Sequence, residues 1–414
     1  MSRKFLDKFA IDYFPASPYI LFVYENGYKK IHPRFPVSIS RIASMADFSI
    51  KLFFSDRNEC TMSEKLIENN LNRLLGWTPV RKLPKKPRIV IFSDLHMGNG
   101  KGRDDFMKNG LLFKTILKEY YLDNDYEMIL NGDTEELQRF PLKQIRTHWA
   151  PVYDLFHEFN RKNRFYKIIG NHDYNLLLLP ESEREFHLYP ALRFSYKGHA
   201  ILIFHGHQAS PFYEKYNAIA EFLLKYLMNP LHIKNRSPAY DSEKRYRIEK
   251  RVYQFSNRNK IISIIGHTHR PLFESLSKID FLKFKIEHLC RHYSEAGQKE
   301  KQVIEKDIII YKEELKRATK KERKTGMRSS LYDSTLTIPC TFNSGSGIGK
   351  RGVTAIEITG DRILLVHWFD KRRRKKYYNH YEHKPERLGQ THFYRMILEQ
   401  DHLDYIFTRI KLLA

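Results

Sequence analysis

Five short segments of this chain combine carboxylate, amide and imidazole side chains, the groups that bind divalent metal ions. The segments are Asp94-Leu95-His96, Gly132-Asp133-Thr134-Glu135-Glu136, Gly170-Asn171-His172-Asp173, His205-Gly206-His207 and Gly266-His267-Thr268-His269. Each follows a short apolar run that is typical of a buried strand. These runs are residues 88–92, 128–130, 167–169, 201–204 and 261–265. Because loops at the carboxyl ends of neighbouring strands converge, we expect the five segments to form one site.

Each segment alone is weak evidence, since Asp-x-His, Gly-Asp and single histidines are common in loops. The ordered set is stronger. Burying so many ionisable groups at strand ends without a metal ion would leave carboxylates and imidazoles unpaired, at a high free-energy cost. The set therefore predicts a metal site.

In this order the segments resemble the motifs of the calcineurin-like metallophosphoesterase superfamily, D-x-H, G-D-x-x-D/E, G-N-H-D/E, H and G-H-x-H. The resemblance runs from about residue 87 to residue 273. It resumes at Phe342-Asn343-Ser344-Gly345-Ser346 and at an expected strand over 353–358. It implies an α/β fold of the four-layer α+β type, a β-sandwich of two mixed sheets flanked by helices, with helical insertions.

The resemblance also implies two divalent metal ions per chain. The first would be held by Asp94, His96, Asp133 and His269. The second would be held by Asp133, Asn171, His205 and His267, so that Asp133 bridges both ions. Nitrogen and oxygen ligands without thiolate suit manganese, iron or zinc. We expect manganese, with iron and zinc as alternatives.

The implied reaction is hydrolysis of a phosphomonoester, phosphodiester or pyrophosphate bond by a hydroxide that bridges the two ions. His172 resembles the catalytic histidine that stabilises or protonates the leaving oxygen, and Asp173 would orient its imidazole. Glu136 is expected beside the ligands rather than on a metal ion. His207 is either a partner of a ligand or a turn residue. Arg270 either binds phosphate or forms a surface ion pair.

The insertion between the fourth and fifth segments resembles the helical cap of bacterial UDP-2,3-diacylglucosamine pyrophosphatases. Residues 132–136 and 266–271 match the G-D-x-x-E and G-H-T-H-R-P forms of that branch, which typically has Arg where this chain has His172. A lipid pyrophosphatase and a nuclease are therefore alternatives within the enzyme class. A scaffold that binds nucleic acid or membrane is the non-enzyme alternative, which the complete ligand set disfavours.

The chain has 414 residues, with 72 Lys and Arg against 48 Asp and Glu, and a net charge of +24. This balance favours a phosphorylated substrate, nucleic acid or an anionic membrane surface as partner, unless it reflects only the composition of the source proteome. The densest basic run is KRRRKK at 371–376. Three cysteines without metal-ligand spacing, no signal-peptide pattern and no apolar run of about 20 residues predict a cytoplasmic protein, with peripheral membrane binding as an alternative.

We expect an N-terminal extension with a basic linker over 1–86, a core over 87–370, and a C-terminal basic run and helix over 371–414. The core would carry a cap insertion at 208–260, which is either a lid or a hairpin packed on the core. A second, charged insertion is expected at 278–330. Apolar periodicity predicts helices over 62–75, 105–121, 152–165, 212–227, 241–255, 304–315 and 391–412.

Overall fold

The computed structural model describes residues 20–24, 27–31, 59–210, 242–275, 278–324, 337–350, 352–373 and 384–414. The chain divides into two units, Met1–Ser63 and Glu64–Ala414. In the first unit, β1 (Ile20–Tyr24) pairs antiparallel with β2 (Gly27–Ile31). The second unit contains the five polar segments.

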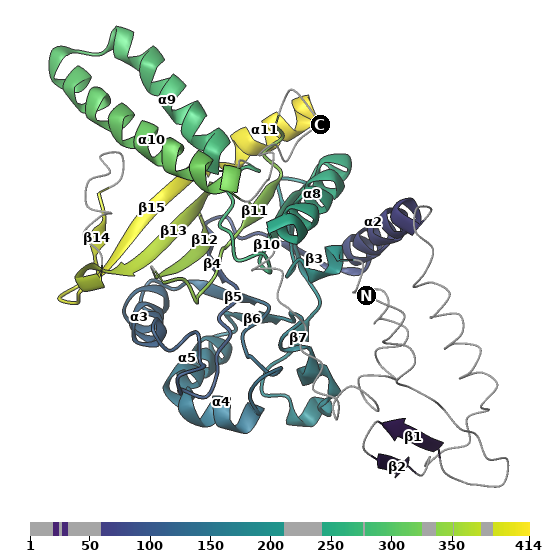
Figure 1. The fold of residues 1–414 in the computed structure, drawn as a ribbon. Helices are drawn as coiled ribbons and strands as arrows, with labels where there is room; N and C mark the ends of the chain where they lie inside the picture. Colours follow the sequence, from purple (N-terminus) through teal and green to yellow (C-terminus); the bar gives the residue numbers. More distant parts are fainter. Residues whose placement is uncertain are drawn as a thin grey trace. The chain divides into compact units, whose positions relative to one another are not determined.

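Two mixed sheets form the second unit (Figure 1). The larger has the order β14-β15-β13-β12-β4-β5-β6-β7. Its strands are β4 (Arg88–Phe92), β5 (Glu127–Asn131), β6 (Phe165–Ile168), β7 (Leu188–Tyr189), β12 (Val353–Thr359), β13 (Arg362–Asp370), β14 (Glu386–Arg387) and β15 (Phe393–His402). The smaller has the order β11-β10-β9-β8-β3, with β3 (Val80–Lys82), β8 (Leu192–Tyr196), β9 (His199–Ile203), β10 (Ile262–Ile265) and β11 (Thr341–Asn343).

Successive side chains of a strand point to opposite faces of its sheet. Both faces of each sheet are buried, one in the core between the sheets and the other under helices. In β4, Ile89 and Ile91 pack with residues of the smaller sheet such as Ile264, which forms the core of a sandwich. Val90 and Phe92 point the other way and pack against helices. This explains why β4 is apolar throughout rather than alternating with polar residues.

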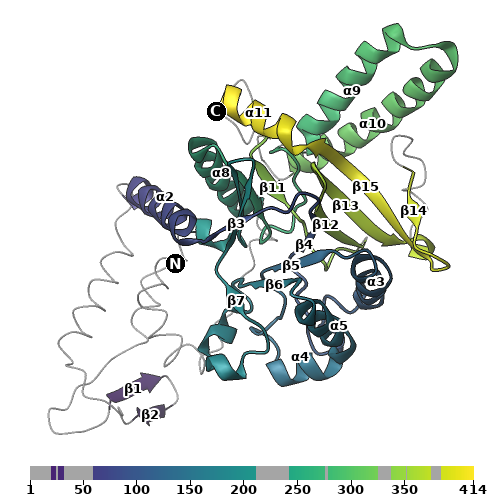
Figure 2. The same cartoon turned by 180° about the vertical axis from the view of Figure 1, so that it is seen from behind.

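Helices cover the outer faces of both sheets (Figures 1 and 2). On the larger sheet these are α3 (Gly110–Ile116), its π-helical continuation (Leu117–Leu122), and α5 (Ala150–Arg161), which follows α4 (Leu142–His148). On the smaller sheet they are α2 (Glu59–Trp77) and α8 (Ser242–Asn259). The C-terminal α11 (Leu403–Leu413) packs into the core between the sheets. The predicted fold class is confirmed.

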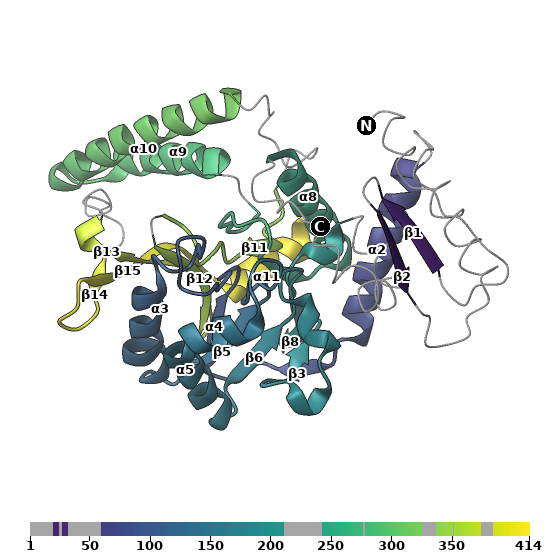
Figure 3. The same cartoon turned by 60° about the horizontal axis from the view of Figure 1, so that its bottom comes forward.

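Short 3-10 turns lie at Tyr174–Leu178, Glu181–Glu183, His207–Ala209 and Lys371–Arg373. The charged insertion is a helical hairpin of α9 (Lys278–Glu295) and α10 (Gln298–Lys324), which lie side by side in Figure 3. Its two helices share an apolar cluster that includes Leu282, Leu289 and Ile304. The predicted helix over 304–315 therefore exists as part of α10.

Most of the other predicted helices are also present. Residues 62–75 lie in α2, and residues 241–255 correspond to α8. The stretch over 105–121 becomes helical only at Gly110, and the one over 152–165 ends at Arg161 because Phe165 already begins β6. The predicted helix over 212–227 lies outside the described residues.

The C-terminal prediction was half wrong. Residues 403–413 are helical, but Phe393–His402 is β15, paired along its length with β13. Phe393, Met396 and Ile397 have helix-like spacing, but backbone pairing with β13 outweighs that local pattern. The eight-stranded sheet therefore continues past the boundary expected at residue 370.

The N-terminal boundary also differs from the predicted one. Ile67 and Leu71 of α2 are buried with α8, and β3 pairs in parallel with β8. Residues 64–83 therefore belong to the second unit rather than to the extension expected over 1–86. No helix among the described residues is long and apolar enough to cross a bilayer.

Candidate metal centre

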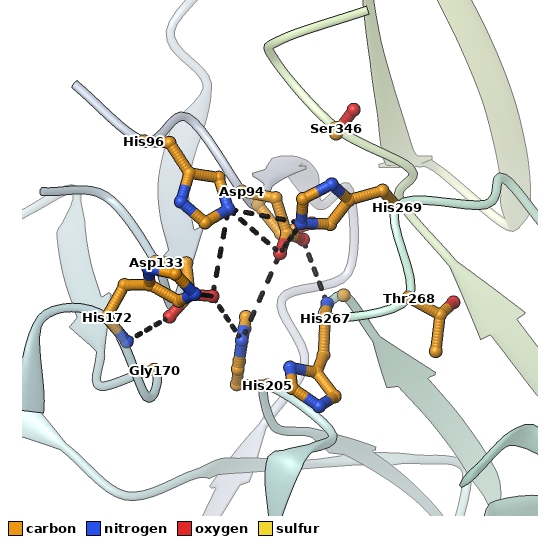
Figure 4. A network of polar contacts seen from close by, with 12 residues as sticks. Asp94, His96, Asp133, Gly170, His172, His205, His267, Thr268, His269 and Ser346 are labelled. Atoms are coloured by element: carbon orange, nitrogen blue, oxygen red, sulfur yellow. Dashed lines mark hydrogen bonds and ion pairs between the residues drawn. The ribbon is translucent and has the colours of Figure 1, made fainter. Parts of the chain in front are cut away.

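The polar segments lie at the carboxyl ends of β4, β5, β6, β9 and β10, and their side chains converge (Figure 4). Backbone hydrogen bonds tie the first two loops together: the Asp94 amide donates to the Gly132 carbonyl at 3.1 Å and the His96 amide to the Asp133 carbonyl at 2.9 Å. Fixed loops reduce the entropy lost when the side chains order around a ligand.

Several site residues adopt positive φ, which non-glycine residues rarely do. They are Asp94, His96, Asp133, His267 and His269, with φ between 47° and 62°. Such backbone strain is held in place by the surrounding fold and concentrates at functional sites. The positive φ angles were not predictable from the sequence, because these residue types do not require positive φ.

Asp94 and Asp133 use their carboxylate oxygens in the same way. One oxygen of each accepts a backbone amide: Asp94 Oδ2 from His267 at 2.9 Å, and Asp133 Oδ1 from His172 at 2.8 Å. The other oxygen faces imidazole nitrogens. Each carboxylate is thus oriented by the backbone while one oxygen remains directed into the site.

The first cluster contains Asp94, His96 and His269. His269 Nε2 lies 3.0 Å from Asp94 Oδ1 and 3.1 Å from His96 Nε2. Two imidazole nitrogens and a carboxylate oxygen at this spacing can share one cation.

The second cluster contains Asp133, His205 and His267. His205 Nε2 lies 3.1 Å from Asp133 Oδ2. The same Asp133 oxygen is 3.8 Å from His96 Nε2 of the first cluster. Asp133 therefore lies between the two clusters, as a bridging carboxylate requires.

Hydrogen bonds also select the ring nitrogens that face the site. His96 Nδ1 donates to Glu136 Oε2 at 3.0 Å, and His205 Nδ1 donates to the Asn131 carbonyl at 2.8 Å. Both bonds leave Nε2 directed at the carboxylates. Metal-binding histidines are usually held in this manner through their other nitrogen.

Three buried atoms of the site, Asp94 Oδ1, Asn171 Oδ1 and His205 Nε2, have no hydrogen-bond partner. Leaving such atoms unsatisfied costs free energy. All three belong to residues that the sequence assigned as metal ligands, and all are donor atoms suited to Mn, Fe or Zn. The donor set therefore fits divalent cations.

Residues 87–271 match the calcineurin-like phosphoesterase family. The matched range contains all five polar segments and both clusters. A solved structure of a conserved uncharacterised protein from Streptococcus pneumoniae, described as a predicted phosphoesterase, is similar over 68% of this chain and 87% of that chain, at 11% identity and a TM-score of 0.24. No curated protein matches the chain significantly.

In the matched region, Glu136 rather than Asp173 holds the His172 ring. His172 Nδ1 donates to Glu136 Oε1 at 2.9 Å, and its Nε2 lies 4.0 Å from Asp133 Oδ2. Asp173 instead accepts the backbone amides of Gly170 and Thr134, both at 2.7 Å. The expected contact between Asp173 and the imidazole is thus replaced, because these amides orient the Asp173 carboxylate toward the backbone.

The charges of the site strongly shift the pKa values of its imidazoles. Burial opposes charge on His96, but the nearby carboxylate of Asp94 and the hydrogen bond with Glu136 raise its pKa to about 10. Burial likewise opposes charge on His205, yet the negative charges of Asp133 and Asp94 raise its pKa to about 9. Protons on these rings compensate the carboxylates, a role that cations take over when they bind.

The pKa values of His267, Asp133 and Asp173 are also shifted. Burial and the positive charge of His205 lower the pKa of His267 to about 3. Burial would raise the pKa of Asp133, but the charges of His205 and His172 hold it well below its ordinary value. Burial, with the nearby charges of Glu135 and Asp133, raises the pKa of Asp173 to about 6.

His207 and Arg270 lie beside the clusters. The His207 ring centroid is 5.4 Å from that of His205, and burial lowers its pKa well below the ordinary value. Arg270 Nε donates to Glu249 Oε1 at 3.2 Å, and its Nη2 pairs with the other Glu249 oxygen. The sequence left open whether Arg270 binds phosphate or forms a surface ion pair. The ion pair is present, but its partner Glu249 is buried.

Glu249 was missed by the sequence analysis. It lies on α8, is buried, and also accepts a hydrogen bond from Thr268 Oγ1 at 2.7 Å. Glu249 therefore holds the loop that carries His267 and His269 in place. A single glutamate in a charged helix, 21 residues from its arginine, carries no signal in the sequence.

The closing turn also joins the site. Asn343 Nδ2 donates to the Gly266 carbonyl and to Thr268 Oγ1, both at 2.9 Å. The Gly347 amide donates to the Asp94 carbonyl at 3.1 Å. The segment expected at 342–346, together with Gly347, thus supports the loops that carry Asp94 and His267.

Proposed function

We propose that this protein is a dimetal-dependent phosphoesterase that hydrolyses a phosphomonoester, phosphodiester or pyrophosphate bond. The observation that carries the proposal is the pair of neighbouring donor clusters with Asp133 between them. The family match over residues 87–271 supports the same reaction class.

Asp94, His96, Asp133 and His269 would hold one ion, and Asp133, Asn171, His205 and His267 the other. Two divalent ions bound there would supply Lewis acidity toward the phosphoryl oxygens and lower the pKa of a bound water. We propose manganese as the first candidate, with iron or zinc as alternatives.

The chain's own residues would orient the substrate and handle a proton. His172 directs Nε2 toward the clusters, while its Nδ1–H group donates a hydrogen bond to Glu136. An imidazole held in this way can donate a proton from Nε2 to a leaving oxygen. Asp173, which holds the amides of Gly170 and Thr134, would keep the loop that carries His172 in place.

The direct test is hydrolysis of bis-p-nitrophenyl phosphate, p-nitrophenyl phosphate and a p-nitrophenyl nucleotide diester, with added Mn²⁺ or with chelator. Turnover that depends on Mn²⁺ supports the proposal, and the preferred ester narrows the substrate class. Metal binding without turnover of any ester would favour the scaffold alternative.

A lipid-linked pyrophosphatase is the second candidate. The observation that favours it is the contact of Glu249 on α8, within the predicted cap insertion, with the loop of His267 and His269. A cap so attached could present an acyl group to the metal ions. Selective cleavage of a lipid-linked nucleoside diphosphate over the p-nitrophenyl esters would support this candidate.

A further inference from the structure

A polar pocket with a volume of about 40 Å³ lies outside the metal centre. Four of its lining residues are cationic: Lys108, Lys350, Arg372 and Arg373. Asp370 is the acidic residue among those lining it. The pocket therefore carries a net positive charge.

The positive charge is only partly neutralised. Asp370 accepts Arg372 through both oxygens, at 3.1 Å from Nε and 2.8 Å from Nη2. Arg373 Nη1 donates to the Lys108 carbonyl at 2.7 Å, which uses one of its five N–H donors. Among the described residues, no acidic side chain forms an ion pair with Lys108 or Lys350. These cations remain available to an anionic ligand.

The register of the larger sheet places this pocket at the same edge as the metal centre. Ile356 of β12 pairs with Ile91 of β4, three residues before Asp94, and Val353 pairs with Trp368 of β13. The end of β4 that leads to Asp94 and the end of β13 that leads to Asp370 therefore lie on the same side of the larger sheet, with β12 between the two strands.

A direct chain of hydrogen bonds joins the two sites. Asn109, which lines the pocket, donates to the carbonyls of Gly347 and Gly349 at 2.6 and 2.9 Å. The Gly347 amide in turn donates to the Asp94 carbonyl. The loop over 346–350 thus has the metal centre at one end and Lys350 at the other.

We propose that this pocket binds a non-scissile phosphate of a single-stranded oligonucleotide whose scissile phosphate lies at the metal centre. This inference rests on the proposed phosphoesterase function. The hydrogen bonds through Asn109 and Gly347 place the pocket next to the loop of Asp94, and the net charge of +24 favours a long polyanion. The pocket then acts as an anchor that selects chain length rather than as part of the hydrolytic machinery.

The test compares Lys108→Gln/Lys350→Gln with a control, Lys118→Gln/Lys411→Gln, which removes the same charge from exposed lysines elsewhere. Fluorescence anisotropy of a short labelled single-stranded DNA is measured in chelator, so that no cleavage occurs. Loss of the contact with one phosphate reduces the slope of log K against log salt by about 0.7 and weakens binding about 5-fold at 0.1 M salt. The control is expected to bind like the wild type.

Hydrolysis of bis-p-nitrophenyl phosphate, a single phosphate that does not reach the pocket, separates this inference from the proposed function. We expect equal turnover by the pocket variant and the wild type. If the wild type hydrolyses this ester but both double variants bind DNA alike, the pocket inference is wrong and the phosphoesterase remains. If the wild type has no turnover but the pocket variant alone loses DNA binding, the proposed function is wrong and the anion pocket remains.

Binding of an anionic lipid surface instead of an oligonucleotide is tested with the same variants. Met107 and Leu111, both more than half exposed, lie beside these cations and could contact acyl chains. Loss of binding to phosphatidylserine vesicles by the pocket variant, with unchanged DNA binding, would overturn the oligonucleotide assignment.

Discussion

Glu136 Oε1 accepts a hydrogen bond from His172 Nδ1 at 2.9 Å, while the other Glu136 oxygen accepts one from His96 Nδ1 at 3.0 Å. One buried carboxylate therefore fixes the ring of a proposed metal ligand and that of the proposed proton donor. Glu136 thus sets the orientation of these two rings relative to each other. Their centroids are 4.5 Å apart.

We expect Glu136→Gln to lower kcat about 10- to 100-fold, because an amide holds two imidazole N–H groups less well than a carboxylate. In a His172→Ala background the same substitution should lower kcat much less, since part of its effect passes through His172. Steady-state kinetics with bound manganese measured in parallel checks this. Equal effects in both backgrounds would show that Glu136 acts only through His96.

Glu249→Ala should weaken manganese binding about 10- to 100-fold, because the loop between His267 and His269 loses its anchor on α8. Isothermal titration measures the affinity. The matched control is Glu68→Ala, which breaks the exposed ion pair with Arg258 and should leave manganese affinity unchanged. Wild-type affinity in Glu249→Ala would remove the proposed positioning role.

Gly170→Ala should disrupt the site although Gly170 contributes no side chain. A Cβ at this position would lie 2.1 Å from Asp133 Oδ1 and 2.3 Å from the Asp133 amide nitrogen, so the bridging carboxylate has to move. We expect loss of bound manganese with a folded protein, by metal analysis and circular dichroism. Gly76→Ala is the matched control, since Gly76 also lacks a positive φ and nothing lies near its added methyl group.

Without metal, the fold should lose stability as the pH rises. The stabilisation that manganese adds should instead increase with pH. The pKa values of His96 and His205 are raised from 6.5 to about 10 and 9. Their protons therefore stabilise the metal-free fold fully below pH 6.5, and this stabilisation is lost as the pH rises through 9 and 10. Manganese must displace these protons, so it binds more tightly as the pH rises.

Thermal unfolding between pH 6 and pH 9, with chelator or with Mn²⁺, tests this relationship. The increase in Tm caused by Mn²⁺ should be larger at pH 9 than at pH 6. An increase that is equal at both values would contradict the displacement of protons by metal.

The strand ends were predictable because apolar runs followed by polar groups leave few other arrangements. The sandwich and the convergence of Asp94, Asp133 and His205 followed from that pattern and from the family resemblance. The partners of these groups were not predictable, because Asp173 is next to His172 in sequence, whereas its actual partner Glu136 is 36 residues away. Only the backbone conformation decides that Asp173 faces the amides of Gly170 and Thr134.

Residues 393–402 show a different limit. Their apolar spacing is compatible with either a helix or a strand, and a partner strand such as β13 is not visible locally. Glu249 shows the same limit for a site residue, since its role depends on α8 packing against the loop of His267.

The central claim is that Asp133 bridges two metal ions that drive phosphoester hydrolysis. The most direct measurement is Mn²⁺-dependent hydrolysis of bis-p-nitrophenyl phosphate by Asp133→Asn, with bound manganese determined on the same samples. We predict that turnover is abolished and bound manganese falls, because the substitution keeps the shape of the side chain but removes its charge. Near-normal Mn²⁺-dependent turnover in this variant would contradict the claim.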